Sequence, residues 1–436
     1  MGPARETALL RNMKFAGGLA SSARQRFRSK TQPTNVSRFV DVRGQRVARR
    51  ASPDIAIELA TGARLTEIRS SWVELLTRCD EPNVFMDPAL VRIAAEAYPN
   101  SGCSALLAWA TVNGRPRLVG VWAFSVGRAR QSILPIRVLT APPFLHGYAA
   151  SPVIDRSCLD ETLDAMLERI AADPLLPKIL ALDAMVADGP TMQALTRVLR
   201  SRGCCPRILE RSLRPTLKSD LDGKDYLEKA FSAASRKKLR QHRRRLSEKG
   251  ELSSVVITDP HAVRSALEDF LRMEASGWKG EQGTALLCND ADAAFTRSAV
   301  GTLADQDSAC IHALYLGREP VSMQIVLRAG ASAFTWKIAY DETLRAFSPG
   351  MLLLEDYTAA FLKDESIGFV NSCAHDDRGF MSVWTERESI ANLWIDARRG
   401  GSFAFEFLWR LQKAYCGLRA MAKNAYLAPR RTWRRK

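Results

Sequence analysis

FTWKIAYDETLRAFSPGMLLLEDYTAAF, residues 334–361, predicts a strand, a short loop and a helix in direct succession. The strand ends near Asp341 and the helix starts at Ser348. Ser348 can cap the first turn, and Pro349 already has the backbone angle that the first helical position needs. Apolar side chains then share one face at helical spacing: Leu353, Tyr357, Ala360 and Phe361.

The start of this helix has the features of an anion site. The first-turn amides lack helical partners, and the positive end of the helix dipole lies there. Gly350 lets a ligand approach the backbone closely, and Arg345 adds a guanidinium just upstream. These features predict a pyrophosphate-sized site, formed by Arg345, Ser348, Pro349, Gly350, Met351 and Leu352. The alternative is that Ser-Pro-Gly only starts a helix.

Charge is distributed unevenly along the 436 residues. The chain carries a net charge of +16, of which the first 50 residues carry +10 and residues 419–436 carry +7, so residues 51–418 carry −1. The content of 46% apolar and 25% charged residues is typical of globular proteins. A folded nucleic-acid-binding domain should itself be basic, so this distribution argues against a broad nucleic-acid surface.

Cysteine usage and hydropathy indicate a reduced, cytoplasmic protein. The nine cysteines form no CxxC pair, and no apolar run approaches the length of a membrane span. The first thirty residues are rich in Arg and Ser, which is compatible with a disordered basic tail, a transit peptide or a true start at Met13.

The body of the chain predicts two copies of one α/β module. Hairpins with a Gly-Arg turn occur in each half, as VNGRPRLVGV and LGREPVSMQI, within a similar order of helices and strands. We expect a basic tail over 1–50, a first module over 51–217, a second module over 218–418 and a basic tail over 419–436.

Several segments together resemble a known family. These are ASRKKLRQHRRRLSEKG, ASGWKGEQGTAL, REPVSMQIVLRAG, KIAYDETLRAFSPGMLLLED and VNSCAHDDRGFMSVWTERESI, in that order. They resemble the CelD/BcsL-type acetyltransferases of the GNAT superfamily over about residues 215–395, and the two-module layout is similar to that of the Fem peptidyltransferases.

This resemblance implies two tandem GNAT modules, each with a mostly antiparallel sheet flanked by helices. It implies acetyl-CoA or another acyl-CoA as donor, bound at the Ser-Pro-Gly turn, with no metal. The acceptor would be an amino sugar, a polysaccharide precursor or another cell-envelope intermediate. The alternatives are a Fem-like transferase that uses aminoacyl-tRNA, which should carry an extended helical hairpin, and a non-catalytic nucleic-acid-binding protein.

The basic stretch 233–250 predicts a helix with one packed face and cationic sides. It is either a solvated surface or a contact for an anionic donor or acceptor, and it lacks the interleaved aromatic residues that would stack on bases. The residues expected to contact an anion are Arg236, Lys237 and Arg240.

Other candidates follow from the same resemblance. His375 or Asp376 would accept the acceptor's proton, Tyr340 would protonate the leaving thiolate, and an amide of the strand 334–341 would stabilise the oxyanion. Asn371 stands where the family pattern has an acid, which places the acid–base assignment in doubt. Further substrate contacts are expected at Trp278, Lys279, Lys337, Trp384 and Arg387.

The end of the chain combines an apolar helical stripe with a cationic segment. The stripe is expected to pack against the second module, and comprises Ala404, Phe407, Leu408, Leu411, Tyr415, Leu418 and Ala422. The segment RRTWRRK places Trp433 among five cations, which predicts weak peripheral contact with the inner, anionic face of a membrane.

Overall fold

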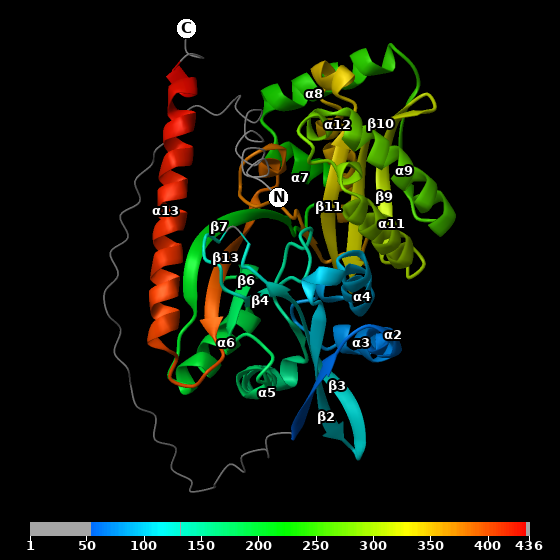
Figure 1. The fold of residues 1–436 in the computed structure, drawn as a ribbon. Helices are drawn as coiled ribbons and strands as arrows, with labels where there is room; N and C mark the ends of the chain where they lie inside the picture. Colours follow the sequence, from blue (N-terminus) through cyan, green and yellow to red (C-terminus); the bar gives the residue numbers. More distant parts are fainter. Residues whose placement is uncertain (1–53, 131, 433–436) are drawn as a thin grey trace, which may run out of the picture.

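The computed structural model describes residues 54–130 and 132–432, with side chains described up to residue 422. The predicted basic tail over 1–50 and the segment around Trp433 lie outside the described residues. The fold is of the mixed α/β class predicted from the sequence, with a large, mostly antiparallel sheet flanked by helices (Figure 1).

The first half forms a sheet covered by helices. Its elements are β1 (Ile55–Ala60), α2 (Ala63–Glu67), α3 (Arg69–Leu76), α4 (Pro88–Ala97), β2 (Ser104–Val112), β3 (Arg115–Gly127), β4 (Val138–Ala141), β5 (Val153–Ile154), α5 (Leu159–Ala172), β6 (Ile179–Val186), α6 (Pro190–Ser201) and β7 (Arg207–Leu217). The predicted hairpin is present, with Asn113 and Gly114 at positive φ between β2 and β3.

The second half repeats this order of elements. They are α7 (Gly223–Ala230), α8 (Ala233–Ser247), β8 (Leu252–Ile257), α9 (Pro260–Ser276), α10 (Trp278–Glu281), α11 (Asp290–Ala304), β9 (Ala309–Leu316), β10 (Glu319–Ala329), β11 (Ser332–Tyr340), the 3-10 helix η5 (Glu342–Phe347), α12 (Pro349–Lys363) and β12 (Phe369–Asn371). The predicted Gly-Arg turn joins β9 to β10, with Gly317 in the left-handed region.

A single 13-stranded sheet runs through both halves. The strand order is β1-β2-β3-β4-β6-β13-β7-β12-β11-β10-β9-β8, and β5 pairs with β3. Among the described strands, β4 pairs with β6 and β11 pairs with β12 in parallel, whereas the other pairs are antiparallel. The two modules therefore share one continuous backbone hydrogen-bond network.

The last strand and helix return to the first module. Strand β13 (Glu386–Asp396) lies between β6 and β7, and residues such as Leu393 and Ile395 belong to the first module's core. The sequence division placed this strand within residues 218–418, so the structure differs from that division here. Pairing between distant strands leaves no local sequence signal, which explains the difference.

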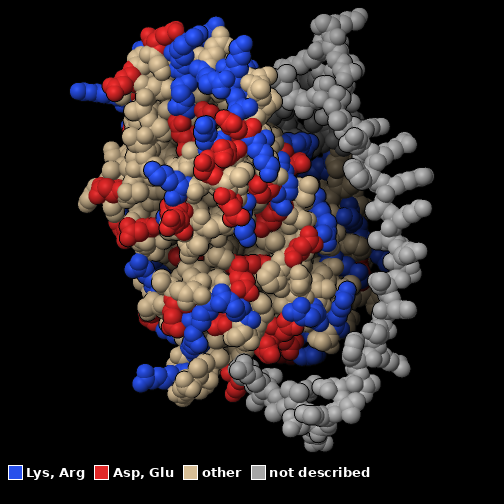
Figure 2. Space-filling view, turned by 180° about the vertical axis from the view of Figure 1, so that it is seen from behind, with Lys and Arg blue, Asp and Glu red and all other residues tan. Residues whose placement is uncertain are grey.

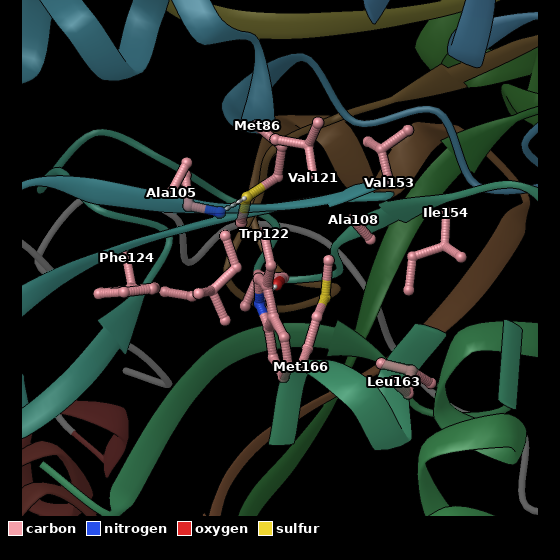
Figure 3. Close-up of a cluster of buried hydrophobic side chains, with 14 of the residues drawn as sticks. Met86, Ala105, Ala108, Val121, Trp122, Phe124, Val153, Ile154, Leu163 and Met166 are labelled. Atoms are coloured by element: carbon pink, nitrogen blue, oxygen red, sulfur yellow. Dashed lines mark hydrogen bonds between the residues drawn. The ribbon is translucent and has the colours of Figure 1, made fainter. Parts of the chain in front are cut away.

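Each half has its own apolar core. In the first, Trp122 and Met166 are fully buried between the sheet and α5, as Figure 3 shows. Gly120 permits this packing, because a Cβ there would lie 2.7 Å from the Thr162 side chain on α5. The polar edge of Trp122 is satisfied by the carbonyl of Ala150, at 3.2 Å.

The final helix α13 (Phe403–Thr432) lies along the outside of the molecule next to β7 (Figure 1). It packs through Phe405 and Gln412, which are 3% and 2% exposed. The predicted buried stripe is wrong, since Phe407 and Leu418 point outward and are 68% and 65% exposed. The helix covers only a small apolar cluster around Trp394, and that cluster engages the opposite side of the helix. In the described part of the chain no helix is both long and apolar enough to span a bilayer.

Candidate functional site

The helix α12 starts where the sequence predicts, but its cap differs. Pro349 is the first helical residue, and Ser348 precedes it in the left-handed conformation with φ 53°. The Ser348 side chain makes no capping hydrogen bond, so the prediction of a serine cap is wrong. Its carbonyl accepts from the Met351 and Leu352 amides at 2.9 and 3.2 Å instead. The left-handed turn thus removes the hydroxyl from the amides it was expected to cap.

The N-terminus of α12 is open and carries no negative side chain. Its first turn has no acidic residue. A Cβ at Gly350 would meet only Tyr340 and Ile338 of β11, at 3.7 and 3.8 Å. Arg345 is exposed on η5, directly before the helix. This arrangement fits a phosphate group, because positive potential and free space coincide at one helix start.

The strand β11 separates from β12 along most of its length. The two pair only from Ser332 to Phe334, so the part of β11 from 335 to 340 continues without β12 beside it. A β-bulge at Trp336 interrupts the pairing of β11 with β10. Such a bulge turns backbone groups away from the ladder and toward a neighbouring site. The opening therefore presents strand backbone next to the start of α12.

The basic helix α8 lies beside η5 and α12. Arg243 anchors it through ion pairs to Glu355 and Asp356 of α12, at 3.1 and 2.6 Å. Of the predicted anion contacts, Lys237 and Arg240 are exposed, whereas Arg236 pairs with Glu228 at 3.4 Å. Figure 2 shows Lys and Arg gathered at the upper end of the molecule, where α8 lies in Figure 1.

Lys337 joins the two modules at the β11 bulge. Its ammonium donates to His146 Nδ1 at 3.1 Å and to the Tyr148 hydroxyl at 3.2 Å. The indole of the bulged Trp336 donates to the carbonyl of His146 at 2.7 Å. Burial opposes the charged form, but Tyr148 and Glu274 together raise the pKa of Lys337 above its ordinary value. Lys337 is therefore a fixed positive charge at this opening.

His146 continues this contact toward α11. Burial and the nearby Lys337 charge lower the pKa of His146, so its ring is neutral. Because Lys337 donates to Nδ1, the ring proton lies on Nε2, which faces Asp292 at 3.6 Å. Asp292 also accepts from the Tyr98 hydroxyl at 2.7 Å. Burial acts against ionisation of Asp292, yet the nearby His146 and the bond from Tyr98 hold its pKa below the usual value.

His375 lies at the same opening, following β12. Its ring is 5.4 Å from that of Tyr148, measured between centroids. Desolvation, followed by the charges of Arg214 and Lys337, lowers the pKa of His375 below its ordinary value, and the exposed surface of this residue keeps that shift modest. Asp376 points elsewhere and forms an ion pair with Arg378 at 2.5 Å. The structure thus places His375 beside Tyr148, which accepts from Lys337, whereas Asp376 pairs with Arg378.

Asn371 occupies a structural position within this opening. Its side-chain oxygen accepts from the Cys373 amide at 2.9 Å, and its amide donates to Glu388 at 3.3 Å. The fully buried Arg214 donates to the carbonyls of Ala374 and Tyr148 at 2.7 and 2.8 Å. These bonds order the chain that carries His375.

Of the remaining predicted substrate contacts, Trp278 and Lys279 lie near β11, whereas Trp384 and Arg387 lie around the start of β13. The Trp278 amide donates to the Glu342 carboxylate at 2.8 Å, and Lys279 pairs with Glu274 at 2.7 Å beside β11. Trp384 is fully buried and donates to Thr358 at 2.9 Å. Arg387 donates to the backbone carbonyls of Ser382, Trp384 and Glu386. Trp384 and Arg387 therefore stabilise a loop, contrary to the expected substrate contact, because neither side chain is directed at the opening.

A cleft of about 320 Å³ lies where the modules meet. Arg128, Arg130 and Thr140 line it from the first module, and Asn289 and Asp292 from the start of α11. The hydroxyl of Thr140, a residue that is 4% exposed, has no hydrogen-bond partner among the described residues. A buried hydroxyl of this kind is costly to leave unpaired, so a polar ligand would be favoured here.

The sequence interpretation missed the contribution of the first module. His146 and Tyr148 lie in APPFLHGYAA, residues 141–150, a segment with two prolines and no regular periodicity. A His and a Tyr within a nonperiodic apolar loop are the signal that was available. Their proximity to Lys337 arises only from the packing of the two modules.

Comparison with known proteins agrees with this architecture. Residues 233–370 match the family model described as an acetyltransferase (GNAT) domain. The open start of α12 and the separated strands β11 and β12 lie inside this range. Residues 233–370 are therefore similar to a GNAT acetyltransferase domain, in line with the superfamily that the sequence resemblance implied. A search of curated proteins finds no significant match.

Solved structures align with most of the chain, and the FemX structure shares its fold. A structure of FemX has 12% identity and a TM-score of 0.53, covering 82% of this chain and 100% of its own. A conserved protein from Bacteroides thetaiotaomicron has 10% identity and a TM-score of 0.46, covering 78% and 99%. A tandem GNAT protein from the clavulanic acid pathway has 12% identity and a TM-score of 0.38, covering 79% and 99%. The likeness to FemX extends the similarity in fold across both modules.

Proposed function

We propose that the protein is an acyltransferase that moves an acyl group, most simply acetyl, directly from acyl-CoA to an amine or hydroxyl. The observation that carries the proposal is the open, acid-free start of α12 beside the free length of β11. The match of residues 233–370 to a GNAT acetyltransferase domain supports it. The finer assignment to the CelD/BcsL type rests on the segment resemblance alone.

The donor would be held by backbone and by charge. The Gly350 amide and the positive end of the α12 dipole, with Arg345, would bind the pyrophosphate, and the exposed Lys237 and Arg240 of α8 would add positive potential. The free length of β11 would pair with the extended arm of the donor. Lys337 and the backbone amide at the bulge would stabilise negative charge on the thioester oxygen.

Two side chains would handle the protons. His375 is neutral near pH 7 and would accept the proton of the attacking amine or hydroxyl. Burial raises the pKa of Tyr340, so its hydroxyl stays protonated and would donate to the leaving sulfur. The acceptor's nitrogen or oxygen forms a bond to the acyl carbon as the carbon–sulfur bond breaks. The acceptor loses one proton to His375, and the leaving sulfur gains one proton from Tyr340.

The acceptor would enter the cleft between the modules. Two arginines, Arg128 and Arg130, and the unpaired hydroxyl of Thr140 favour a polar molecule that carries an acidic group. An amino sugar, polysaccharide precursor or other cell-envelope intermediate has this chemistry when it carries a phosphate or carboxylate group. His146 and Lys337 would connect the cleft to the thioester end of the donor site.

The test is calorimetric titration of the full chain with CoA. Gly350→Val should abolish measurable binding while the protein stays folded, because its Cβ meets only ordinary contacts but its side chain fills the approach to the amides. Gly417→Val is the matched control, since Gly417 is helical and has open space around it. Unchanged affinity in a folded Gly350→Val protein would reject the donor site.

A second candidate is a Fem-like transferase that uses charged tRNA. The fold shared with FemX and the cationic α8 beside η5 favour it. Against it, α9 and α11 pack on the sheet through buried residues, and no extended helical pair projects from the described part of the second module (Figure 1). Transfer from radiolabelled aminoacyl-tRNA, undiminished by excess acetyl-CoA, would favour this second function.

A further inference from the structure

The helix α13 presents an apolar stripe to solvent. We call the outer stripe the set Phe403, Phe407, Leu411, Ala414, Leu418 and Met421. Its large members are 96%, 68%, 41%, 65% and 69% exposed in chain order. The spacing of three and four residues keeps them on one helical face. Over eighteen residues this face is roughly 27 Å long.

The outer stripe is not a continuation of the core. The helix docks through the opposite side, where Phe405 joins the cluster around Trp394 and Gln412 accepts from Ser132 at 2.8 Å. Residues 405, 412 and 416 lie about 180° around the helix from the outer stripe, at 100° per residue. The described chain therefore leaves this apolar face without a covering element, which is unusual for a soluble surface.

The charge around the outer stripe indicates which kind of surface would cover this face of α13. From Phe407 to the chain end at Lys436 there is no Asp or Glu, whereas there are nine Lys and Arg residues. Arg410 and Lys413 are exposed beside the outer stripe. Residues 1–50 carry +10 and a second copy would bring the same cations together, so either partner would meet like charge. An apolar, negatively charged partner is favoured.

We propose that the outer stripe docks the protein in-plane on an anionic phospholipid surface. A long, straight helical face needs a flat partner without a shaped groove, and a bilayer interface supplies both apolar depth and negative headgroups. Each cation near such a surface adds on the order of 1 kcal/mol of attraction. This docking uses the described face of α13, of which the sequence prediction had placed Phe407, Leu411 and Leu418 in the core, and it is independent of the proposed catalytic function.

The test is sedimentation of the full chain with vesicles. Phosphatidylglycerol mixed with phosphatidylcholine should bind the protein, phosphatidylcholine alone should bind it much less, and raised salt should release it. Phe407→Gln combined with Leu418→Gln should reduce partitioning into anionic vesicles by about tenfold or more. Both side chains are exposed, so the variant should keep its unfolding temperature and its CoA affinity.

The matched control combines Val73→Gln with Leu175→Gln, which are 53% and 88% exposed and lie away from α13. This control should partition like the wild type. Equal partitioning of the outer-stripe variant and the control would overturn the proposal, as would equal binding to neutral and anionic vesicles. A dimer in sedimentation velocity that only the outer-stripe variant abolishes would also overturn it, and would assign the face to a second copy.

Discussion

The two modules contain the same strand–helix–strand unit with different helix starts. In the first, β4 and β6 pair in parallel over three residues and α5 connects them, while in the second β11, α12 and β12 repeat the arrangement. The first turn of α5 carries Asp160 and Glu161, whereas that of α12 carries no acid. The chain's own carboxylates complement the dipole of α5, so only α12 can offer its positive end to an anion.

The connections into the two helices differ as well. From β11 to α12 the chain needs only residues 341–348, whereas from β4 to α5 it spans residues 142–158. The longer connection brings His146 and Tyr148 to Lys337 of the second module. Under the proposed function, the second module therefore carries the anion site, whereas the first has an acidic helix start and supplies side chains next to Lys337.

The largest effect on donor binding is expected when the first turn of α12 is given an acidic residue like that of α5. Met351→Glu places a carboxylate at the position that Glu161 has in α5. At an effective dielectric of about 20, a charge roughly 5 Å from a phosphate costs about 3 kcal/mol, or about 100-fold in affinity. Calorimetric titration with CoA measures the effect. A change below about threefold would mean that the phosphates bind elsewhere.

The reciprocal change serves as its control. Asp160→Asn with Glu161→Gln removes the acids of α5 but should create no CoA site, because Asp160 also pairs with Arg197 and no glycine opens the turn. A second mole of CoA bound per mole of this variant would contradict the view that the first module has lost more than its charge.

Acid should act first on the second module. Its core contains His312, whose pKa burial lowers from 6.5 to about 4, whereas the buried residues of the first module's core include no histidine. The unfolded chain binds this proton more tightly, so the associated stability is complete above pH 6.5 and is lost as pH falls toward 4. The shift corresponds to about 3 kcal/mol.

Chemical unfolding measured across this pH range tests the assignment. His312→Leu, which keeps an apolar side chain beside Phe361, should flatten the decline in stability between pH 6.5 and 4. An unchanged slope would show that other groups, and not this core histidine, cause the acid sensitivity of the second module.

Tyr148, which the first module contributes next to Lys337, should affect turnover more than donor binding. Tyr148→Phe removes the hydroxyl that accepts from Lys337 and should lower kcat about tenfold, or about 1.4 kcal/mol, with CoA affinity retained. A double-mutant cycle with Lys337→Met measures the coupling. Additive effects of the two changes would show that the first module does not act through Lys337.

The smallest effect is expected from the exposed basic helix. Arg240→Glu should weaken CoA binding about twofold to fivefold at low salt and have almost no effect at high salt, because exposed charges are screened. Arg244→Glu, further along the same exposed helix, is the comparison variant. Tight, sequence-selective duplex binding by the wild type would instead favour a nucleic-acid role.

The parts of the fold that local chemistry determines were predictable. The turn at Asn113–Gly114, the turn at Gly317 and the helix start at Pro349 all follow from residues that restrict or release the backbone. The GNAT-type second module followed from several short segments in a consistent order. In the site, Lys337 lies on β11 and His375 lies in the loop after β12, and their roles stay predictions.

What depended on contacts between distant segments was not predictable. Trp384 was expected at the substrate but belongs to the core, because an aromatic residue has no local mark that separates the two roles. His146 and Tyr148 lie 191 and 189 residues from Lys337. The apolar side chains of α13 had the right spacing for a helix, but spacing alone does not tell which side meets the protein.

The position of β13 near the end of the chain delays completion of the first module's sheet during synthesis. When a ribosome has made residues up to Leu217, β6 and β7 are both present, but the strand that bonds to both of them is not yet synthesised. The first sheet can close only after residue 396 leaves the exit tunnel, by which time the whole second module has emerged. The nascent chain must therefore keep two strand edges unpaired while residues 218–396 are made, and chaperones would have their main opportunity to bind during that interval. Separating the modules into two independently expressed polypeptides would leave the first with a permanent gap in its sheet.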